Sequence, residues 1–254
     1  MKHGFGIAGI AGRMGRVLVE EVAAAGAPLS GGIDRPGSVT DATLLPDMAA
    51  LAAACELVID FTHASTVQAH AKALAEDGTA WVLGTTGLSA EDEAAVAVAA
   101  ERIAVVYAPN FSPGVNLMLA LAERMAAALP PATYDAEIVE MHHRQKVDAP
   151  SGTAIGIGRA VAAGRGVKLE DVMDSGRNGH TGARITGHIG FAAMRGGQVV
   201  GEHTLLFASG DEHIALTHRA FDRRAFAAGA VRAALWARGK PAGLYTMMDV
   251  LGMR

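Results

Sequence analysis

The chain has 254 residues, half of them hydrophobic and few aromatic, and a formal net charge of −4. This length permits one or two domains, and a mildly acidic chain without a Lys/Arg-rich run is not typical of nucleic-acid-binding proteins. No apolar run approaches the ~20 residues of a transmembrane helix, and the N-terminus lacks a secretory apolar region. Cys55, the only cysteine, lies in an apolar run and is expected in the core. We therefore expect a cytoplasmic protein that acts on a small molecule.

The first fifteen residues predict a strand, a glycine turn and a helix. The apolar run 5–8 precedes glycines at positions 9, 12 and 15, and an amphipathic segment follows. Such glycines let the backbone approach a pyrophosphate, which lies on the N-terminus of the next helix. The spacing is GxxGxxG rather than GxGxxG, and by itself it also fits a structural turn. The candidate cofactor-binding residues here are Gly9, Ile10, Ala11, Gly12, Arg13 and Met14.

A second extended run, residues 29–33, ends at Asp34 and Arg35. A dinucleotide fold places the residue that reads the adenosine ribose about 20 residues after the glycine turn. A carboxylate there accepts from the 2′-hydroxyl of NADH, whereas an arginine pairs with the 2′-phosphate of NADPH. The pair therefore indicates tolerance of either cofactor, and an ordinary charged turn is the alternative.

Apolar strand candidates then alternate with helical segments, as in a parallel βαβ sheet. The strands are expected at 57–61, 80–83 and 103–107, and the helices at 63–76 and 89–102. Ligands of open α/β sheets bind beyond the carboxyl ends of the strands. Two loops at such ends therefore complete the candidate cofactor site, with the residues Gly84, Thr85, Thr86, Ala108, Pro109, Asn110 and Phe111.

The pattern changes after a helix at 117–129 and the break Pro130-Pro131. Strands are expected at 134–141, 185–192, 199–207 and 213–217, the last three joined by turn-like clusters rather than helices. A final helix at 223–238 precedes an apolar tail. We predict an α/β fold whose Rossmann-type dinucleotide-binding domain comprises residues 1–112 plus 222–254. Residues 113–221 would form a substrate-binding and oligomerisation domain on a mainly antiparallel or mixed sheet.

Residues 140–153 carry the most chemistry in the chain. They contain His142, His143 and Lys146 and then a run of small residues, Ser151, Gly152 and Thr153, before the helical segment 154–163. Imidazoles exchange protons near neutral pH, a lysine binds anions or donates a proton, and a capped helix start offers backbone N–H groups to a carboxylate. This combination suits a small anionic substrate that needs protons moved. A solvated basic loop before a helix capped by Ser151 or Thr153 is the alternative.

The motifs together resemble the dihydrodipicolinate reductase family, which is also called 4-hydroxy-tetrahydrodipicolinate reductase, over essentially the whole length. The family's glycine turn, its GTTG loop at 84–87 and its NFSxGVN segment at 110–116 all have counterparts here. The strongest match is the HHRxKxDAPSGTA signature at 142–154, and further matches are GEHT at 201–204 and the closing segments GLY and DVL. Ile10-Ala11 replaces glycine found in some relatives, which leaves the cofactor preference open.

The resemblance implies hydride transfer from NADH or NADPH to a cyclic imine dicarboxylate in lysine and diaminopimelate biosynthesis. It makes His142 the catalytic acid/base and Lys146 the proton donor, with His143, Gly152 and Thr153 binding the substrate. It also implies a homotetramer. No spacing resembles a metal-ligand set, so no metal is expected. A dinucleotide sensor without catalysis and a related reductase acting on an amino-acid semialdehyde are the alternatives, and the loop 177–184 has no assigned role.

Overall fold

The structure is a computed structural model that describes residues 2–253. The chain divides into two compact units. Unit 1 contains Met1–Pro113 and Arg223–Arg254, and unit 2 contains Gly114–Asp222. Each boundary lies one residue after the position proposed from the sequence.

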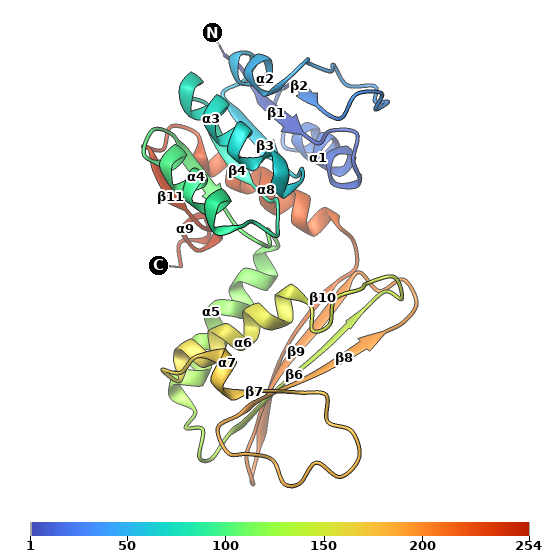
Figure 1. Cartoon of the computed structure of the whole chain (residues 1–254), viewed down its shortest axis with the longest axis vertical. Helices are drawn as coiled ribbons and strands as arrows, with labels where there is room; N and C mark the ends of the chain where they lie inside the picture. Colours follow the sequence, from blue (N-terminus) through green and yellow to red (C-terminus); the bar gives the residue numbers. More distant parts are fainter. Residues whose placement is uncertain (1, 254) are drawn as a thin grey trace. The chain divides into compact units, whose positions relative to one another are not determined.

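Unit 1 is built on a six-stranded sheet in which every pair of neighbouring strands is parallel. The strand order is β11-β5-β4-β3-β1-β2. Most of these strands are short, continuous apolar runs, as expected for strands that are buried on both faces. The strands are β1 (Phe5–Ala8), β2 (Leu29–Ile33), β3 (Leu57–Asp60), β4 (Ala80–Leu83), β5 (Ala104–Tyr107) and β11 (Gly243–Tyr245). The predicted α/β fold with a Rossmann-type sheet is confirmed (Figure 1).

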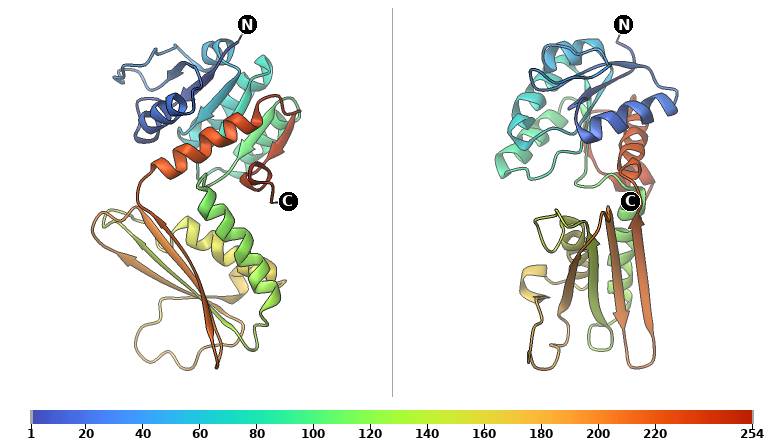
Figure 2. Two further views of the ribbon diagram at one scale, coloured as in Figure 1. Left: turned by 180° about the vertical axis from the view of Figure 1, so that it is seen from behind. Right: turned by 90° about the vertical axis from the view of Figure 1, so that its right-hand side faces the viewer.

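Helices cover both faces of this sheet and enclose two apolar cores. On one face lie α1 (Arg13–Ala24), α8 (Arg224–Ala237) and the short α9 (Met247–Leu251), with a core that includes side chains from β1, β3 and β5. On the other lie α2 (Met48–Ala54), α3 (Val67–Asp77) and α4 (Ala90–Ala100). Figure 2 shows α1 and α8 on the same side of the sheet. Cys55 is completely buried in the second core, as expected.

Differences from the predicted elements of unit 1 are local. The helix expected at 63–76 is divided into a 3₁₀ turn, η1 (Ala64–Thr66), and α3. Helix α2 was not predicted, because its sequence is nearly all alanine and leucine and shows no amphipathic period. Asp47 caps this helix, since its side chain accepts a hydrogen bond from the backbone N–H of Ala50.

Unit 2 contains a five-stranded mixed sheet in the order β10-β9-β6-β8-β7. The strands are β6 (Asp135–His142), β7 (Met173–Ser175), β8 (Ile189–Arg195), β9 (Gly201–Ala208) and β10 (His213–Ala220). Strand β9 is antiparallel to β6 and β10, whereas β8 is parallel to β6 and β7. The parallel pairing of β6 with β8 arises because helices lie between them in the chain and form a crossover connection.

One face of this sheet is covered by α5 (Pro113–Ala128), α6 (Gly152–Gly164) and the single-turn α7 (Leu169–Val172). Along β6, buried residues alternate with partly exposed ones, so that Glu140 and His142 lie on the same face as Ala136 and Ile138. Among the predicted elements of unit 2, two begin furthest from their expected positions. The strand expected at 185–192 begins only at Ile189, as β8, because residues 185–188 belong to a glycine-containing loop. The helix expected at 117–129 begins earlier, at Pro113, and proline is suited to the first position of a helix.

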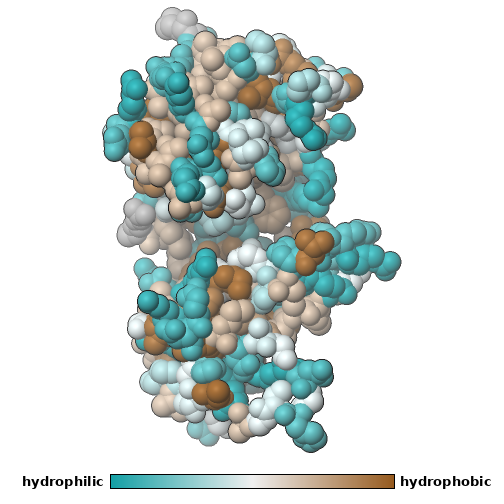
Figure 3. Space-filling view, in the orientation of Figure 1, coloured by the Kyte–Doolittle hydropathy of each residue, from teal (hydrophilic) through white to brown (hydrophobic). Residues whose placement is uncertain are grey.

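On the surface shown in Figure 3, apolar residues occur as separate small groups among polar ones. Within residues 2–253, no helix is both long enough and apolar enough to cross a bilayer.

Candidate functional site

The glycine turn of unit 1 connects β1 to α1 through a tightly packed backbone. Gly9 has a positive φ of 81°, and the N–H of Gly12 donates to its carbonyl at 3.0 Å. A Cβ at Gly15 would overlap the carbonyl oxygens of Gly9 and Ile10, so only glycine fits there. The first hydrogen bond of the helix runs from the N–H of Arg16 to the carbonyl of Gly12, at 3.1 Å. The preceding N–H groups, of residues 13–15, have no partner inside the helix and suit an anion.

Asp34 fixes the end of β2 against this turn. One carboxylate oxygen accepts from the N–H of Ala11 at 2.8 Å, and the other accepts from Arg35 N–H and Ser38 Oγ. Burial alone would raise the pKa of Asp34, but these hydrogen bonds hold it below its ordinary value. The carboxylate is therefore ionised at neutral pH, with lone pairs left for further donors.

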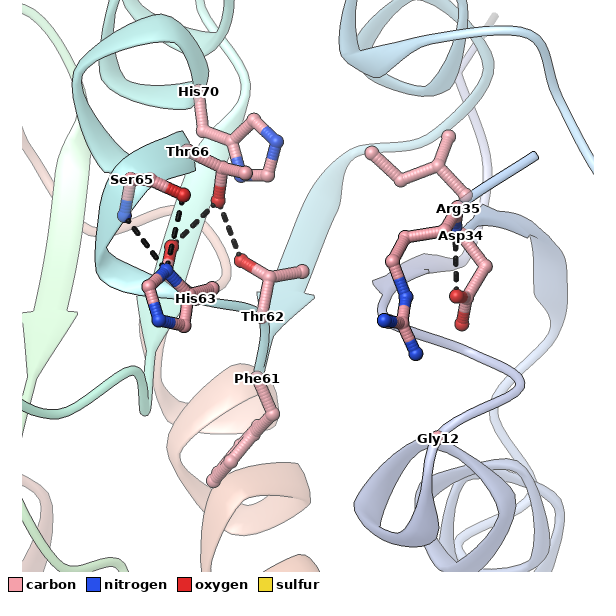
Figure 4. Close-up of a pocket in the computed structure, with 11 residues that line it drawn as sticks. Gly12, Asp34, Arg35, Phe61, Thr62, His63, Ser65, Thr66 and His70 are labelled. Atoms are coloured by element: carbon pink, nitrogen blue, oxygen red, sulfur yellow. Dashed lines mark hydrogen bonds between the residues drawn. The ribbon is translucent and has the colours of Figure 1, made fainter. Parts of the chain in front are cut away.

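A cavity of about 590 Å³ lies beside Asp34. Gly9, Gly12, Asp34 and Arg35 form one side of it, and the segment Phe61–Thr66 forms another (Figure 4). In that segment Thr62 Oγ1 donates to the buried Asp60, whose other oxygen lies 2.8 Å from His70 Nδ1. The cavity thus combines one carboxylate with several hydroxyl groups and nitrogens, a lining that suits a ribose and its phosphates.

A second cavity of unit 1, of about 290 Å³, gathers other predicted cofactor residues. It is lined by Arg13, Met14, Pro109, Asn110 and Phe111, together with Phe61, Arg223 and Phe226. Two further candidates, Ile10 and Ala108, have buried side chains, so they could contribute only through their backbone.

The loop after β4 lies against the same phenylalanine. A Cβ at Gly84 would overlap the ring of Phe61, and Thr85 Oγ1 accepts a hydrogen bond from Thr62 N–H at 3.1 Å. Thr86 is exposed beside them. The glycine turn thus contributes to two cavities of unit 1, one beside Asp34 and one beside the loop after β5, and Phe61 lines both. The residues present fit a dinucleotide.

In unit 2, the end of β6 carries a buried polar cluster. His142 Nδ1 lies 2.6 Å from Glu140 Oε2, and Arg195 of β8 binds both oxygens of Glu140, at 2.7 and 2.8 Å. The N–H of Ser151 also donates to Glu140, at 3.1 Å. His203 of β9 meets the edge of the His142 ring, with a centroid distance of 5.1 Å, and its Nε2 lies 3.1 Å from Ser151 Oγ.

Burial controls the charges in this cluster. Burial lowers the pKa of His142, and the nearby cations Lys146 and Arg195 lower it further. The hydrogen bond and the negative charge of Glu140 act in the opposite direction. Burial lowers the pKa of His203 more strongly, to about 4. For Glu140, burial would raise the pKa, but the hydrogen bonds from Arg195, His142 and Ser151 lower it. At neutral pH the cluster thus contains an ionised glutamate and neutral imidazoles.

The loop after β6 carries the remaining substrate candidates. Lys146 Nζ pairs with Asp148 Oδ1 at 2.8 Å, and its side chain keeps about a fifth of its surface exposed. Ser151 is the N-cap of α6, since its hydroxyl accepts from Ala154 N–H; Thr153 lies within the helix. Gly152 is exposed, with open space where a side chain would be. His143, which follows His142, is half-buried and is not in the Glu140 cluster.

The basic loop at 177–184 is anchored at the opposite end of β6. Arg177 and Arg184 both bind Glu137, and Arg184 also binds Asp135. Five residue-to-residue steps along an extended strand, about 16 Å, separate Glu137 from His142. Among residues 2–253, no group of three or more His, Cys, Asp or Glu side chains could hold a metal ion.

Comparisons with known proteins agree over both units. The family model described as dihydrodipicolinate reductase, N-terminus, matches residues 4–111, and the one described as dihydrodipicolinate reductase, C-terminus, matches residues 114–251. The chain belongs to the dihydrodipicolinate reductase family. A 4-hydroxy-tetrahydrodipicolinate reductase of Granulibacter bethesdensis is 71% identical over 98% of this chain and 97% of its own length. That of Gluconacetobacter diazotrophicus is 64% identical over 98% and 96%. The resemblance seen in the sequence and the prediction of an NAD(P)H-dependent oxidoreductase are confirmed.

Solved structures show the same fold. A dipicolinate-bound dihydrodipicolinate reductase from Paenisporosarcina sp. TG-14 has a TM-score of 0.78 with 24% identity, covering 98% of this chain and 99% of its own. GenD2 from gentamicin A biosynthesis, in complex with NAD, has a TM-score of 0.59 with 17% identity, covering 99% and 91%.

Several residues of these sites received no role from the sequence. Glu140 opens the histidine-rich stretch but has no signature of its own, and Arg195 belongs to a turn-like cluster with two glycines. In the sequence, His203 is one of several scattered histidines to which no role was given, although it lies in the matched GEHT segment. The segment Phe61–Thr66 was expected only as the end of the strand at 57–61 and the start of the helix at 63–76. Pairing of β6 with β8 and β9 brings the first three together, and no local pattern reveals such pairing.

Proposed function

We propose that this chain reduces 4-hydroxy-tetrahydrodipicolinate to tetrahydrodipicolinate with NADH or NADPH, in the cytoplasm and as a step of lysine and diaminopimelate biosynthesis. The observation that carries the proposal is the cluster at the end of β6. There a neutral imidazole, His142, is held by a buried Glu140. A lysine and an exposed helix start follow within ten residues. The reduction of this dicarboxylate requires both proton transfer and the binding of a carboxylate.

Unit 1 would hold the cofactor, which supplies the hydride. The backbone of Gly9, Ile10, Ala11 and Gly12 and the first turn of α1, with Arg13 and Met14, would bind the pyrophosphate. Asp34 and Arg35 would bind the adenosine ribose. The residues after β4 and β5 would flank the remainder of the cofactor; they are Gly84, Thr85, Thr86, Ala108, Pro109, Asn110 and Phe111.

Unit 2 would hold the substrate. The exposed Gly152 and the adjacent Thr153, at the start of α6, would bind one carboxylate, and His143 would bind the substrate as well. Hydride addition builds negative charge on the substrate, and the ammonium of Lys146 would stabilise that charge and then donate a proton. His142 would act as the acid/base. Asp148 holds Lys146 in the structure, and a substrate carboxylate could replace it as partner.

For the cofactor preference we propose that both dinucleotides are used. The ionised Asp34 favours the ribose hydroxyl of NADH. The guanidinium of the exposed Arg35, at the rim of the same cavity, favours the phosphate of NADPH.

We further propose that unit 2 assembles the protein into a homotetramer. The edge strand β10 is largely exposed. Partly exposed residues of β6 and β9, such as Met141 and Leu206, lie on the face of the sheet opposite α5 and α6. This surface is the proposed interface between subunits. Light scattering coupled to gel filtration measures the mass directly. A monomer at working concentration would contradict this proposal.

The activity is tested by following oxidation of NADH and of NADPH while a dihydrodipicolinate synthase makes the substrate from pyruvate and aspartate semialdehyde. Oxidation that depends on the synthase is the expected result, and the two rates give the cofactor preference. Tight NADH binding without oxidation would instead favour a dinucleotide sensor. Oxidation with aspartate semialdehyde in the absence of the synthase would favour a semialdehyde reductase.

A further inference from the structure

The carboxylate of Glu140 is the point at which three segments of unit 2 meet. It lies on β6 and is only 1% exposed. Its two oxygens accept hydrogen bonds from Arg195 of β8, from the N–H of Ser151 before α6, and from His142 on its own strand. Arg195 in turn donates to the carbonyl oxygen of Asp148, in the loop that carries Lys146. Glu140 is thus connected to His142, to the start of α6 and to the loop that carries Lys146.

The charge of Glu140 determines which proton His142 keeps. An isolated carboxylate at this depth would be costly, and the bidentate pair with Arg195 compensates. The hydrogen bonds that lower the pKa of Glu140 keep it ionised. An ionised carboxylate has no proton to give, so at the 2.6 Å contact the Nδ1 of His142 must be the donor. In a neutral ring, Nε2 then carries the lone pair.

The groups around His142 keep the ring neutral. Arg195 on β8 and Lys146 in the loop after β6 are cations, and among residues 2–253 Glu140 is the one anion that contacts the ring. From β9 the ring meets His203, which is neutral at physiological pH because burial lowers its pKa to about 4. Burial and the two cations outweigh Glu140, so the pKa of His142 lies below its usual value.

Strand β9 also leaves room for the imidazole. Gly201 lies beside the ring, and a Cβ there would come within 3.0 Å of His142 Nε2. A side chain at this position would have to push Nε2 aside. Gly201 therefore leaves space for Nε2, while Glu140 holds the ring at Nδ1.

We propose that Glu140 and Arg195 are positioning residues for His142, and that they hold Nδ1 as the donor and present Nε2 to the substrate as a proton acceptor. The inference rests on the proposed function only in what Nε2 acts upon. In the hydroxylated substrate, Nε2 would take the ring proton next to the hydroxyl-bearing carbon, and the electron pair of that C–H bond would form a C=C bond as the hydroxide leaves. The hydroxide takes up a proton and departs as water. The positive charge that forms on the imidazole lies next to Glu140, which stabilises it. Lys146 supplies the proton that the reduced substrate needs, so the acceptor and the donor are different residues.

The tautomer is measured without any substrate. In uniformly ¹⁵N-labelled wild-type protein, correlation spectra of the imidazole nitrogens at pH 7 distinguish the two tautomers and the imidazolium. His142→Gln identifies the signal. We expect a protonated Nδ1 and an unprotonated Nε2. The opposite tautomer, or an imidazolium at pH 7, would overturn the proposal whether or not the protein turns over.

The kinetic test compares Glu140→Gln with Glu137→Gln. Glu137 lies on the same strand and also pairs with arginines, Arg177 and Arg184, but does not contact His142. We expect E140Q to lower kcat at least about tenfold, by analogy with other partners that orient an active-site histidine. The KM for NADH should change by less than about twofold, because unit 1 is untouched.

The pH profile separates positioning from a merely structural role. Removing the negative charge of Glu140 lowers the pKa of His142 further, so the acid limb of kcat should move to lower pH in E140Q while E137Q keeps the wild-type profile. Equal kcat values and profiles in the two variants, with an active wild type, would overturn the inference. A wild-type protein that reduces no substrate would overturn the proposed function instead. In that case, and also if E140Q does not fold, the tautomer measurement tests the inference by itself.

Discussion

The carboxylate of Asp34 accepts a hydrogen bond of 2.8 Å from the backbone N–H of Ala11, and this bond joins the end of β2 to the glycine turn. Residue 34 therefore has two tasks. It holds the turn in shape, and it also lines the cavity proposed for the ribose, with lone pairs left to accept further hydrogen bonds. The two tasks can be separated by measurement.

Asp34→Ala should weaken NADH binding at least about tenfold, because the variant loses one charge-assisted hydrogen bond to the cofactor. NADPH binding should suffer less, because removal of the carboxylate also removes repulsion of the 2′-phosphate beside Arg35. Titration of nicotinamide fluorescence measures both dissociation constants. Asp47→Ala is the matched control, since Asp47 also accepts from a backbone N–H in unit 1 but caps α2. Equal losses for both cofactors would show that Asp34 acts only on the turn.

Much of unit 1 was accessible from sequence because its signals are local. The strands are continuous apolar runs and the glycine turn has a fixed spacing, so β1, β2 and β4 were placed at their observed ends. The cluster in unit 2 was not accessible in this way. Glu140, Arg195 and His203 are separated by up to 63 residues and meet only because β8 and β9 pair with β6. Strand order and register decide such contacts, and neither leaves a short sequence pattern.

Lys146→Ala should lower kcat about 100-fold or more while leaving NADH affinity nearly unchanged. The ammonium is the proposed proton donor, and a positioned acid of this kind contributes about 10² to 10⁴ in rate. The coupled assay gives kcat, and fluorescence titration gives the affinity. Lys72→Ala is the control, since Lys72 is an exposed lysine of α3 in a similar ion pair, with Glu76. A K146A variant with near-wild-type turnover would exclude Lys146 as the donor.

The buried His203 should make the folded protein less stable as the pH falls from 7 to 5. Its folded pKa is about 4, because burial disfavours the imidazolium, against about 6.5 when unfolded. Between these values the unfolded chain binds a proton that the folded chain does not, so stability falls as the pH falls. The loss from this residue is about 2 kcal/mol between pH 7 and pH 5.

His203→Gln should remove that part of the pH dependence. Urea unfolding at pH 7 and at pH 5 measures the change in the free energy of unfolding, and the variant should lose about 2 kcal/mol less than the wild type. Some dependence should remain, because burial also lowers the pKa of His142 and His218. The control is His213→Gln, at the exposed start of β10. If H203Q and H213Q both behave as the wild type does, His203 is not the residue that senses pH.

Gly15→Ala tests the glycine turn itself. A Cβ at this position would overlap the carbonyl oxygens of Gly9 and Ile10, so α1 must move away from the turn or the turn must open. Because the proposed pyrophosphate site is made of that backbone, we expect NADH binding to be lost and the melting temperature to fall by several degrees. Gly156→Ala, in the interior of α6, is the matched control, since its Cβ would meet only Leu119 at an ordinary 3.6 Å. That variant should bind NADH normally and gain up to about 1 kcal/mol, since alanine is the better helix former. A G15A protein that binds NADH as the wild type does would show that the turn tolerates a side chain and is not the pyrophosphate site.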